Sequence, residues 1–338
     1  MIKRLFKIFK DKKKIVLILF SVTFILLIVN VIAARIFPNE SDRKKDLSSV
    51  EINKKFIDGI KRFGLAEDWI VRKESKDKSS ETSFSSYIIS VPSDLPIPVL
   101  LSEVFNEFSG TSVSIISKEL KPGGLSELEI LTDGKKNLKA NFDYQKTIHR
   151  KAGFIGFIIY DEGQMGEENY KLLNSSAEKL SFLFLPSYGV RNIIDSCKKE
   201  YALILNDEIN DVDFKLQSGY SEKRLSESIR AIIKAFGNAV FFMIDDDASI
   251  FNSSKGKFII DWLNKGKLKI LFKNKIITLT SQFNIDDELK KILDSMSDGE
   301  TKLIILSSSD YLSLGDEIMR YKKIGYKFIN PSEVLQMH

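Results

Sequence analysis

Two kinds of hydrophobic pattern follow one another along this chain. From residue 153 onward, short and wholly apolar runs such as 153–160 ("GFIGFIIY") alternate with amphipathic stretches of helical period such as 221–237. Strands without polar alternation are typical of a parallel sheet that is buried on both faces, with the helices as crossovers. Seven or eight such repeats favour a deformed (β/α)7-8 barrel, closed or nearly closed, in an α/β fold.

One connection departs from this rhythm. Residues 268–272 and 276–281 both have strand character, yet only Lys273, Asn274 and Lys275 separate them. A crossover helix does not fit into three residues, so the pattern predicts either a missing barrel helix or an antiparallel pair at this point.

The region before the barrel alternates more strictly and predicts a small α+β domain. Asp133-Gly134 indicates the tip of a hairpin, and the polar stretch 73–83 is expected to be a solvated loop. The elements expected here are helices at 51–63 and 96–108, and strands at 85–91, 111–120, 127–133 and 134–144.

The amino terminus carries a third pattern. Residues 15–34 contain no charged side chain, and a helix needs about 20 such residues to cross a bilayer. The first 14 residues hold seven Lys or Arg against one Asp, which places the amino terminus in the cytoplasm and the rest outside. A cleaved signal peptide is the alternative, but the apolar stretch exceeds its usual length. We expect a single-pass inner-membrane protein with periplasmic domains.

The expected domains follow from these patterns. They are a basic leader at 1–14, a transmembrane helix at 15–36, a linker at 37–50, the small α+β domain at 51–148 and the barrel at 149–338.

Charge and cysteine content narrow the possible partners. The 338 residues carry a formal net charge of +5, and the leader alone accounts for +6, so the remaining chain has a net charge of −1. Without a basic excess outside the leader, a nucleic-acid partner is not expected. The single cysteine, Cys197, cannot form an internal disulfide.

In a barrel, chemistry belongs at the carboxyl ends of the strands, and here those positions are rich in carboxylates and hydroxyls. They contain no histidine, since the chain has only His149 and His338. The polar residues concerned are Asp161 and Glu162; Ser187 and Tyr188; Asn206, Asp207 and Glu208; Asp245, Asp246 and Asp247; and Ser307, Ser308, Ser309 and Asp310. Strand ends and caps commonly hold such residues, so 245–247 is expected to be a solvated turn.

The order of these landmarks resembles that of the divergent polysaccharide deacetylases, envelope proteins with a deformed β/α barrel. The stretches that carry the resemblance are 157–164 ("FIIYDEGQ"), 180–189 ("LSFLFLPSYG") and 302–335, which closes the chain with a strand, a helix and a short strand before Ser-Glu-Val-Leu. The resemblance covers about residues 50–336 in order.

The resemblance implies a divalent metal such as zinc, held by histidines after the third, fourth and seventh strands. The corresponding stretches here, 203–211, 240–249 and 303–313, contain no histidine. Zinc sites commonly use imidazole ligands, so we expect the metal site to be lost and no cofactor to be bound. Asp161 is then the family-equivalent catalytic residue without its partners. The candidate binding residues at the rim are Glu162, Tyr188, Asn206, Asp207, Asp245 and Ser308.

Three functions stay open at this point. The leading hypothesis is a membrane-anchored envelope protein whose deacetylase-like barrel is catalytically impaired and binds glycan or an envelope protein. The first alternative is an active carbohydrate hydrolase or deacetylase that uses rim carboxylates Asp161, Glu162 and Asp207, because glycoside cleavage needs two carboxyls. The second alternative is a non-catalytic scaffold for protein partners.

Overall fold

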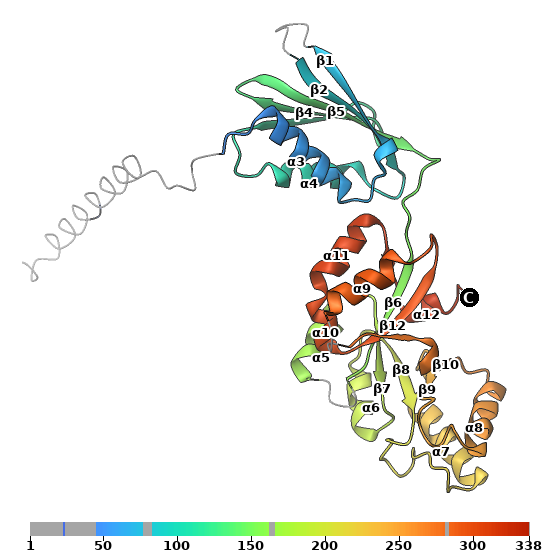
Figure 1. The fold of residues 1–338 in the computed structure, drawn as a ribbon. Helices are drawn as coiled ribbons and strands as arrows, with labels where there is room; N and C mark the ends of the chain where they lie inside the picture. Colours follow the sequence, from blue (N-terminus) through green and yellow to red (C-terminus); the bar gives the residue numbers. More distant parts are fainter. Residues whose placement is uncertain (1–22, 24–44, 77–82, 162–165, 281–283, 338) are drawn as a thin grey trace, which may run out of the picture. The chain divides into compact units, whose positions relative to one another are not determined.

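The computed structural model describes residue 23 and residues 45–76, 83–161, 166–280 and 284–337 (Figure 1). These residues form two compact units. Unit 1 comprises the chain up to Gly59 with Ile70–Ser90 and Ile97–Asp143, and unit 2 comprises Ile60–Trp69, Val91–Pro96 and the chain from Tyr144. Apart from Thr23, the predicted membrane helix lies outside the described residues. Within the described part of the chain, no helix is long and apolar enough to span a membrane.

Unit 1 is a five-stranded sheet with helices on one face (Figure 1). The strand order is β1-β2-β5-β4-β3. The elements are α3 (Ser49–Lys61), β1 (Ile70–Lys76), β2 (Ser83–Pro92), α4 (Ile97–Glu107), β3 (Ser114–Glu119), β4 (Ser126–Thr132) and β5 (Lys135–Gln145). Phe56 of α3 packs against the rings of Tyr87 and Phe142, with centroids 5.3 and 6.5 Å away. This apolar layer holds the helices on the sheet.

The hairpin predicted at Asp133-Gly134 is confirmed. β4 and β5 pair antiparallel, and Thr132 faces Lys135 across a two-residue turn. Asp133 has φ 49° and Gly134 has φ 75°. Both central residues are left-handed, which is the geometry of a type I′ turn and explains the Asp-Gly sequence.

The solvated loop predicted at 73–83 is partly wrong. Residues Lys73 to Lys76 continue β1, which pairs antiparallel with β2 along its whole length. β1 is an edge strand whose residues are mostly exposed and charged, so it lacks the apolar alternation by which a strand is recognised. Its stability comes from backbone hydrogen bonds to β2.

Unit 2 is a mixed α/β unit around an eight-stranded sheet of order β10-β9-β8-β7-β6-β12-β11, with β13 also pairing β6. The pairings are parallel. The strands are β6 (Phe154–Ile159), β7 (Ser181–Phe184), β8 (Glu200–Leu205), β9 (Phe242–Ile244), β10 (Ile270–Phe272), β11 (Ile277–Thr278), β12 (Thr301–Leu306) and β13 (Lys327–Phe328). The α-helices are α5 (Glu167–Ser175), α6 (Tyr188–Asp195), α7 (Glu222–Ala235), α8 (Ser254–Lys265), α9 (Ile285–Asp294), α10 (Ser308–Ser313), α11 (Gly315–Ile324) and α12 (Pro331–Val334).

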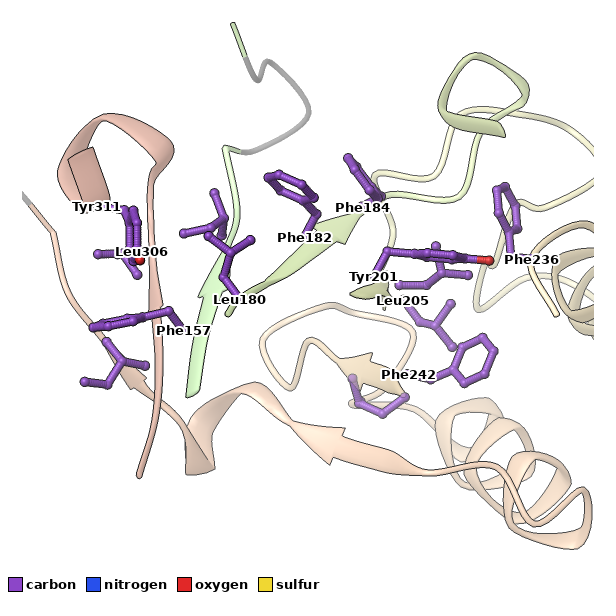
Figure 2. Close-up of a cluster of buried hydrophobic side chains, with 14 of the residues drawn as sticks. Phe157, Leu180, Phe182, Phe184, Tyr201, Leu205, Phe236, Phe242, Leu306 and Tyr311 are labelled. Atoms are coloured by element: carbon purple, nitrogen blue, oxygen red, sulfur yellow. The ribbon is translucent and has the colours of Figure 1, made fainter. Parts of the chain in front are cut away.

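Both faces of this sheet are buried, as the apolar runs predict. One face packs on the helices, and Figure 2 shows large rings such as Phe157, Phe182 and Phe242 from several strands in this layer. The other face forms a separate apolar cluster that includes Ala202 and Ile204 of β8. Because side chains alternate along a strand, neighbouring residues of β8 fill different layers.

The irregular connection at Lys273–Lys275 is a short 3-10 helix, η3. β10 pairs only with β9 and β11 only with β12, both in parallel, so the two strands stand at the two ends of the sheet. The missing-helix alternative is therefore confirmed, and the antiparallel alternative is wrong. The sheet curls but stays open along the seam between β10 and β11, since these strands do not pair.

The amino end of the curled sheet is filled by α12. A Cβ atom on Gly156 of β6 would lie 2.8 Å from Leu303 and 3.1 Å from both Pro331 and Val334. A side chain at this position would displace its neighbours, because these distances are tighter than most Cβ contacts. The helix α12 is thus packed closely on β6.

Candidate functional site

A pocket of about 760 Å³ opens at the carboxyl ends of β6, β11 and β12. Its volume lies within the range of small-molecule sites. The wall is polar and apolar in about equal parts, and its polar residues include Asp161, Asn169, Lys273, Thr278, Thr280 and Ser308. The parallel topology brings these residues together from three separate segments of the chain.

Asp161 lies two residues after the end of β6 and binds the start of α10. Its Oδ1 accepts a hydrogen bond of 2.7 Å from the backbone N–H of Ser308. Its Oδ2 is buried and has no hydrogen-bond partner in the part of the chain that the structure describes. Ser308 is itself 3% exposed, and its Oγ accepts a hydrogen bond of 3.0 Å from Asn169 Nδ2. Asp161 and Ser308, both predicted site residues, are thus joined in one pocket wall.

Asp245 follows β9 and is neutralised by a lysine. Both of its carboxylate oxygens accept from Lys273 Nζ, at 3.2 and 3.1 Å. Its neighbour Asp246 accepts a 3.0 Å bond from the backbone N–H of Asn274. The prediction of a solvated turn at 245–247 is wrong for Asp245, which is 9% exposed. Its burial requires the partner cation, because an unpaired buried carboxylate is costly.

Asn206 and Asp207 follow β8 and stabilise the local backbone. Asp207 accepts from the backbone N–H groups of Ser249 and Ile250 at 2.5 and 3.2 Å, and Asn206 is buried and accepts from Glu208 N–H at 3.1 Å. The described residues that line the pocket do not include Asp207. The convergence of Asp207 with Asp161 is therefore not observed, and Glu162 lies outside the described residues.

Tyr188 begins α6 and lies away from the pocket wall. Its backbone N–H donates to Asp211 and its hydroxyl to Asp213, both at 2.6 Å, while its ring packs 4.9 Å from that of Phe214. The hydrogen bond to Asp213 raises the pKa of Tyr188, because it stabilises the neutral phenol. With 51% exposure the residue is available at the surface, as predicted, but it is tied to the loop after β8.

The side chains present do not fit a zinc ion. Zinc sites need three protein ligands, usually with nitrogen or sulfur donors. In the described ranges, no three His, Cys, Asp or Glu side chains converge as a metal site would require. The ammonium of Lys273 also lies against Asp245 and repels a second cation. His149 Nε2 lies 3.2 Å from Asp298 Oδ2. His149 precedes β6 and Asp298 precedes β12, so this pair lies at the amino ends of the strands. His338 is outside the described residues.

Two features of the pocket were missed from the sequence. In the sequence, Lys273 stands out only as part of a tight connection, and Thr278 and Thr280 only as part of a strand. The available signal is the alternation at 278–280, from the end of β11 onward, where polar Thr278 and Thr280 flank buried Leu279. Two polar residues at this spacing share a face of the strand, so they point into one site.

Comparisons with known proteins give matches among solved structures alone, since no family model and no curated protein matches the chain. A family 4 carbohydrate esterase from Bacillus anthracis is 12% identical, with 56% of this chain and 84% of that chain covered and a TM-score of 0.34. PdaA of Bacillus subtilis, another family 4 carbohydrate esterase, is 10% identical, with 56% and 82% covered and a TM-score of 0.34.

A pseudoenzyme of the same esterase family from Bacillus anthracis matches over more of the chain. It is 14% identical, with 85% of this chain and 94% of that chain covered and a TM-score of 0.35. The structural neighbours are thus carbohydrate esterases of family 4, including pseudoenzymes, which is the resemblance that the sequence indicates. At identities and TM-scores of this size, activity and ligand have to be argued from the site itself.

Proposed function

We propose that this chain is a membrane-anchored envelope protein whose unit 2, a divergent polysaccharide-deacetylase-like domain, binds glycan without hydrolysing it. The anchor would be the apolar segment 15–34, with the described units on the outer side of the inner membrane. The proposed ligand is an envelope glycan, bound in the pocket beside Asp161.

The observation that carries this proposal is the ion pair between Lys273 and Asp245. A metal-dependent hydrolase needs ligand carboxylates or imidazoles that are free to bind the ion. Here Asp245 is only 9% exposed and binds an ammonium with both oxygens. Asp161 Oδ1 is likewise occupied by the Ser308 amide. Among the described rim residues, these carboxylate oxygens bind the protein itself, and no group of three metal ligands converges.

The pocket wall supports a saccharide as the ligand. Thr278, Thr280 and Ser309 add hydroxyls beside the amide of Asn169 in a pocket of about 760 Å³. Hydroxyls and amides can both donate and accept hydrogen bonds, as the hydroxyls of a sugar do. A few placed polar groups of this kind fix the orientation of a small ligand.

The two alternatives fit the geometry less well. A hydrolase that pairs Asp161 with Asp207 would need both carboxylates beside the same glycosidic bond, but Asp207 binds the backbone at Ser249 and Ile250. A pure scaffold would not require an open pocket beside Asp161, and a pocket is present there.

The test uses the full-length protein in a mild detergent, because the segment 15–34 is apolar. We expect calorimetry to detect binding of chito-oligosaccharide or peptidoglycan fragments, with no release of acetate from acetylated fragments. Thr278→Val, which removes a hydroxyl from the pocket wall, should weaken binding by about threefold to tenfold, the value of one neutral hydrogen bond. Thr147→Val, at an exposed position outside the pocket, is the matched control.

Stoichiometric zinc in the purified protein, together with acetate release that depends on Asp161, would show an active enzyme and refute the proposal. Binding that Thr278→Val leaves unchanged would place the glycan elsewhere. The anchor is tested on the same preparation, since the protein should sediment with membranes and require detergent for release.

A further inference from the structure

Unit 1 contains a second pocket, of about 530 Å³, between α3 and the corner of the sheet formed by β1 and β2. We refer to it as the α3 cleft. The residues of the cleft on which the argument rests are Ser49 and Asn53 of α3, Arg72 of β1, Ser85 and Tyr87 of β2, and Asn137 of β5. None of them takes part in the site of unit 2.

The composition of the α3 cleft departs from the rule for a covered sheet face. Register places Arg72 opposite Tyr87 and Glu74 opposite Ser85, on the face that carries the buried Ile89 and is covered by the helices. Such positions are normally apolar, because they exclude water from the core. Here Tyr87 is 2% and Ser85 7% exposed, so polar atoms have been built into the interior at this corner.

These polar atoms are held in fixed positions. The Tyr87 hydroxyl donates to Asn53 Oδ1 at 2.9 Å, and Ser49 Oγ donates to Asn137 Oδ1 at 2.9 Å. Burial raises the pKa of Tyr87, so its hydroxyl stays protonated and remains a donor near neutral pH. The wall of the cleft is therefore preorganised before any ligand arrives.

A β-bulge places Asn137 in this network. The register between β4 and β5 shifts at Ile130/Leu131: Ile130 faces Leu138 and Leu131 faces Lys136, so Asn137 has no residue opposite it on β4. The extra residue turns its amide toward α3, where Oδ1 meets Ser49, and its Nδ2 donates to Thr132 Oγ1 at 2.9 Å. Bulges commonly redirect a side chain next to a binding site.

The hydrogen-bonding capacity that remains in the cleft is mainly that of a donor. The amide groups of Asn53 and Asn137 already donate to Ser49 O and Thr132 Oγ1. Among the described residues, Arg72 makes a single hydrogen bond, from Nη2 to Ser85 Oγ at 3.2 Å. A guanidinium has five N–H donors, so most of those of Arg72 are unused. Among the described residues no carboxylate forms an ion pair with Arg72, although Glu74 and Asp58 also line the cleft.

We propose that the α3 cleft binds the carboxylate of a small organic ligand, with Arg72 as the residue that contacts it. A planar guanidinium matches a carboxylate through two parallel hydrogen bonds. The acids Glu74 and Asp58 limit the ligand to one anionic group that enters at Arg72, since a second would meet like charge. Both a sugar acid and the carboxyl end of a short peptide carry this chemistry. The site is independent of the glycan pocket in unit 2.

The experiment measures binding to the full-length protein in detergent by ligand-observed NMR. The probes are glucuronate, an N-acetylated dipeptide with a free carboxyl end, inorganic phosphate, and glucose as the uncharged counterpart of glucuronate. We expect glucuronate or the dipeptide to bind and glucose not to bind. Arg72→Gln should weaken that binding about tenfold or more, because it removes charge-assisted hydrogen bonds, and Arg72→Lys should weaken it less.

The matched control is Lys73→Gln. Lys73 lies next to Arg72 on β1 but on the opposite face of the sheet, where it pairs with Ser86. The substitution therefore removes the same charge from the same strand without changing the wall of the cleft. Glucuronate binding alone identifies a sugar acid and dipeptide binding alone a peptide end, and either supports the carboxylate. The proposal is overturned by phosphate binding alone, by equal binding of glucose and glucuronate, by binding to none of the four probes, or by equal effects of Arg72→Gln and Lys73→Gln. Circular dichroism establishes that each variant is folded.

Discussion

Each unit of this protein has a pocket with basic residues in its wall, and two of them, Lys273 and Arg72, are in opposite situations. Lys273 in unit 2 donates to both oxygens of Asp245 and joins the end of β9 to the connection before β11. Arg72 in unit 1 makes one hydrogen bond, to a serine hydroxyl. The ammonium of Lys273 is neutralised by a carboxylate of the protein, whereas most N–H donors of Arg72 are unused among the described residues.

This difference separates a structural charge from a charge that is available to a ligand. A polar group in a pocket can bind a ligand only through the hydrogen-bond donors and acceptors that are not already used within the fold. Lys273 follows β10 and binds Asp245 at the end of the neighbouring strand β9, so its charge neutralises a carboxylate that the fold buries. Arg72 has no such carboxylate as a partner among the described residues, so its charge is not committed to the fold.

The largest effect should follow from breaking the paired cation. Lys273→Met leaves Asp245, whose side chain is 12% exposed, without its partner. A buried charge that loses its partner costs several kcal/mol, and the partial exposure of Lys273 reduces this to about 2 kcal/mol of unfolding free energy. Both tryptophans, Trp69 and Trp262, belong to unit 2, so urea unfolding followed by tryptophan fluorescence measures this unit.

Two further variants show whether the charge itself is responsible. Lys265→Met, at an exposed position in α8, should change the unfolding free energy by less than about 0.5 kcal/mol. Adding Asp245→Asn to Lys273→Met should restore part of the loss, because no unpaired carboxylate remains. If Lys273→Met matched Lys265→Met, the ion pair would not stabilise unit 2.

An intermediate effect is expected at the bulge of unit 1. Asn137→Ala removes the hydrogen bonds to Ser49 and Thr132, which should cost about 1 kcal/mol and speed amide exchange in β5. It should also weaken carboxylate binding, because the wall of the cleft is no longer fixed. Asn141→Ala, on the same strand and opposite Glu127, is the control. Equal exchange rates in both variants would contradict a fixed cleft.

The contrast between the two sheets also explains what could be predicted from the sequence. The central strands of unit 2, β6, β7 and β8, are buried on both faces, so their apolar runs, such as 153–160, identify them. β1 in unit 1 is an exposed edge whose composition, "IVRKESK", gives almost no hydrophobic signal. The connection between β10 and β11 was predicted in part. Its three residues, 273–275, are too few for a crossover helix, but they do not show which strands β10 and β11 pair with.

The acids of the candidate site were predictable because each stands at the end of an apolar run. Asp161 and Asp245 were found in this way, but pairing decided their roles: one meets the Ser308 amide and the other meets Lys273. Lys273 follows its strand within a polar connection, where a lysine is unremarkable in composition. Arg72 was missed because its strand was missed. Long-range register, which the sequence does not display, determines which charges meet.

The smallest effect, and the sharpest test of the unpaired cation, is expected at Arg72. Arg72→Gln should change the unfolding free energy of unit 1 by less than about 0.5 kcal/mol, since an exposed guanidinium with one hydrogen bond contributes little. It should nevertheless raise the pKa of Tyr87 further. Burial raises this pKa above the usual value of about 10, and the cation of Arg72 opposes the rise by favouring the tyrosinate.

Because the folded-state pKa of Tyr87 lies above the unfolded value, the stability linked to this phenol is fully present below about pH 10. It is lost as the pH rises through the folded-state pKa, and Arg72→Gln should move that loss to higher pH. Titration of tyrosine labelled with ¹³C at Cζ measures the shift directly by NMR. Lys73→Gln, on the other face of β1, should leave the pKa of Tyr87 almost unchanged. A lower pKa in Arg72→Gln would mean that the guanidinium does not face Tyr87, and the α3 cleft would then lack the charge that distinguishes it from the pocket of unit 2.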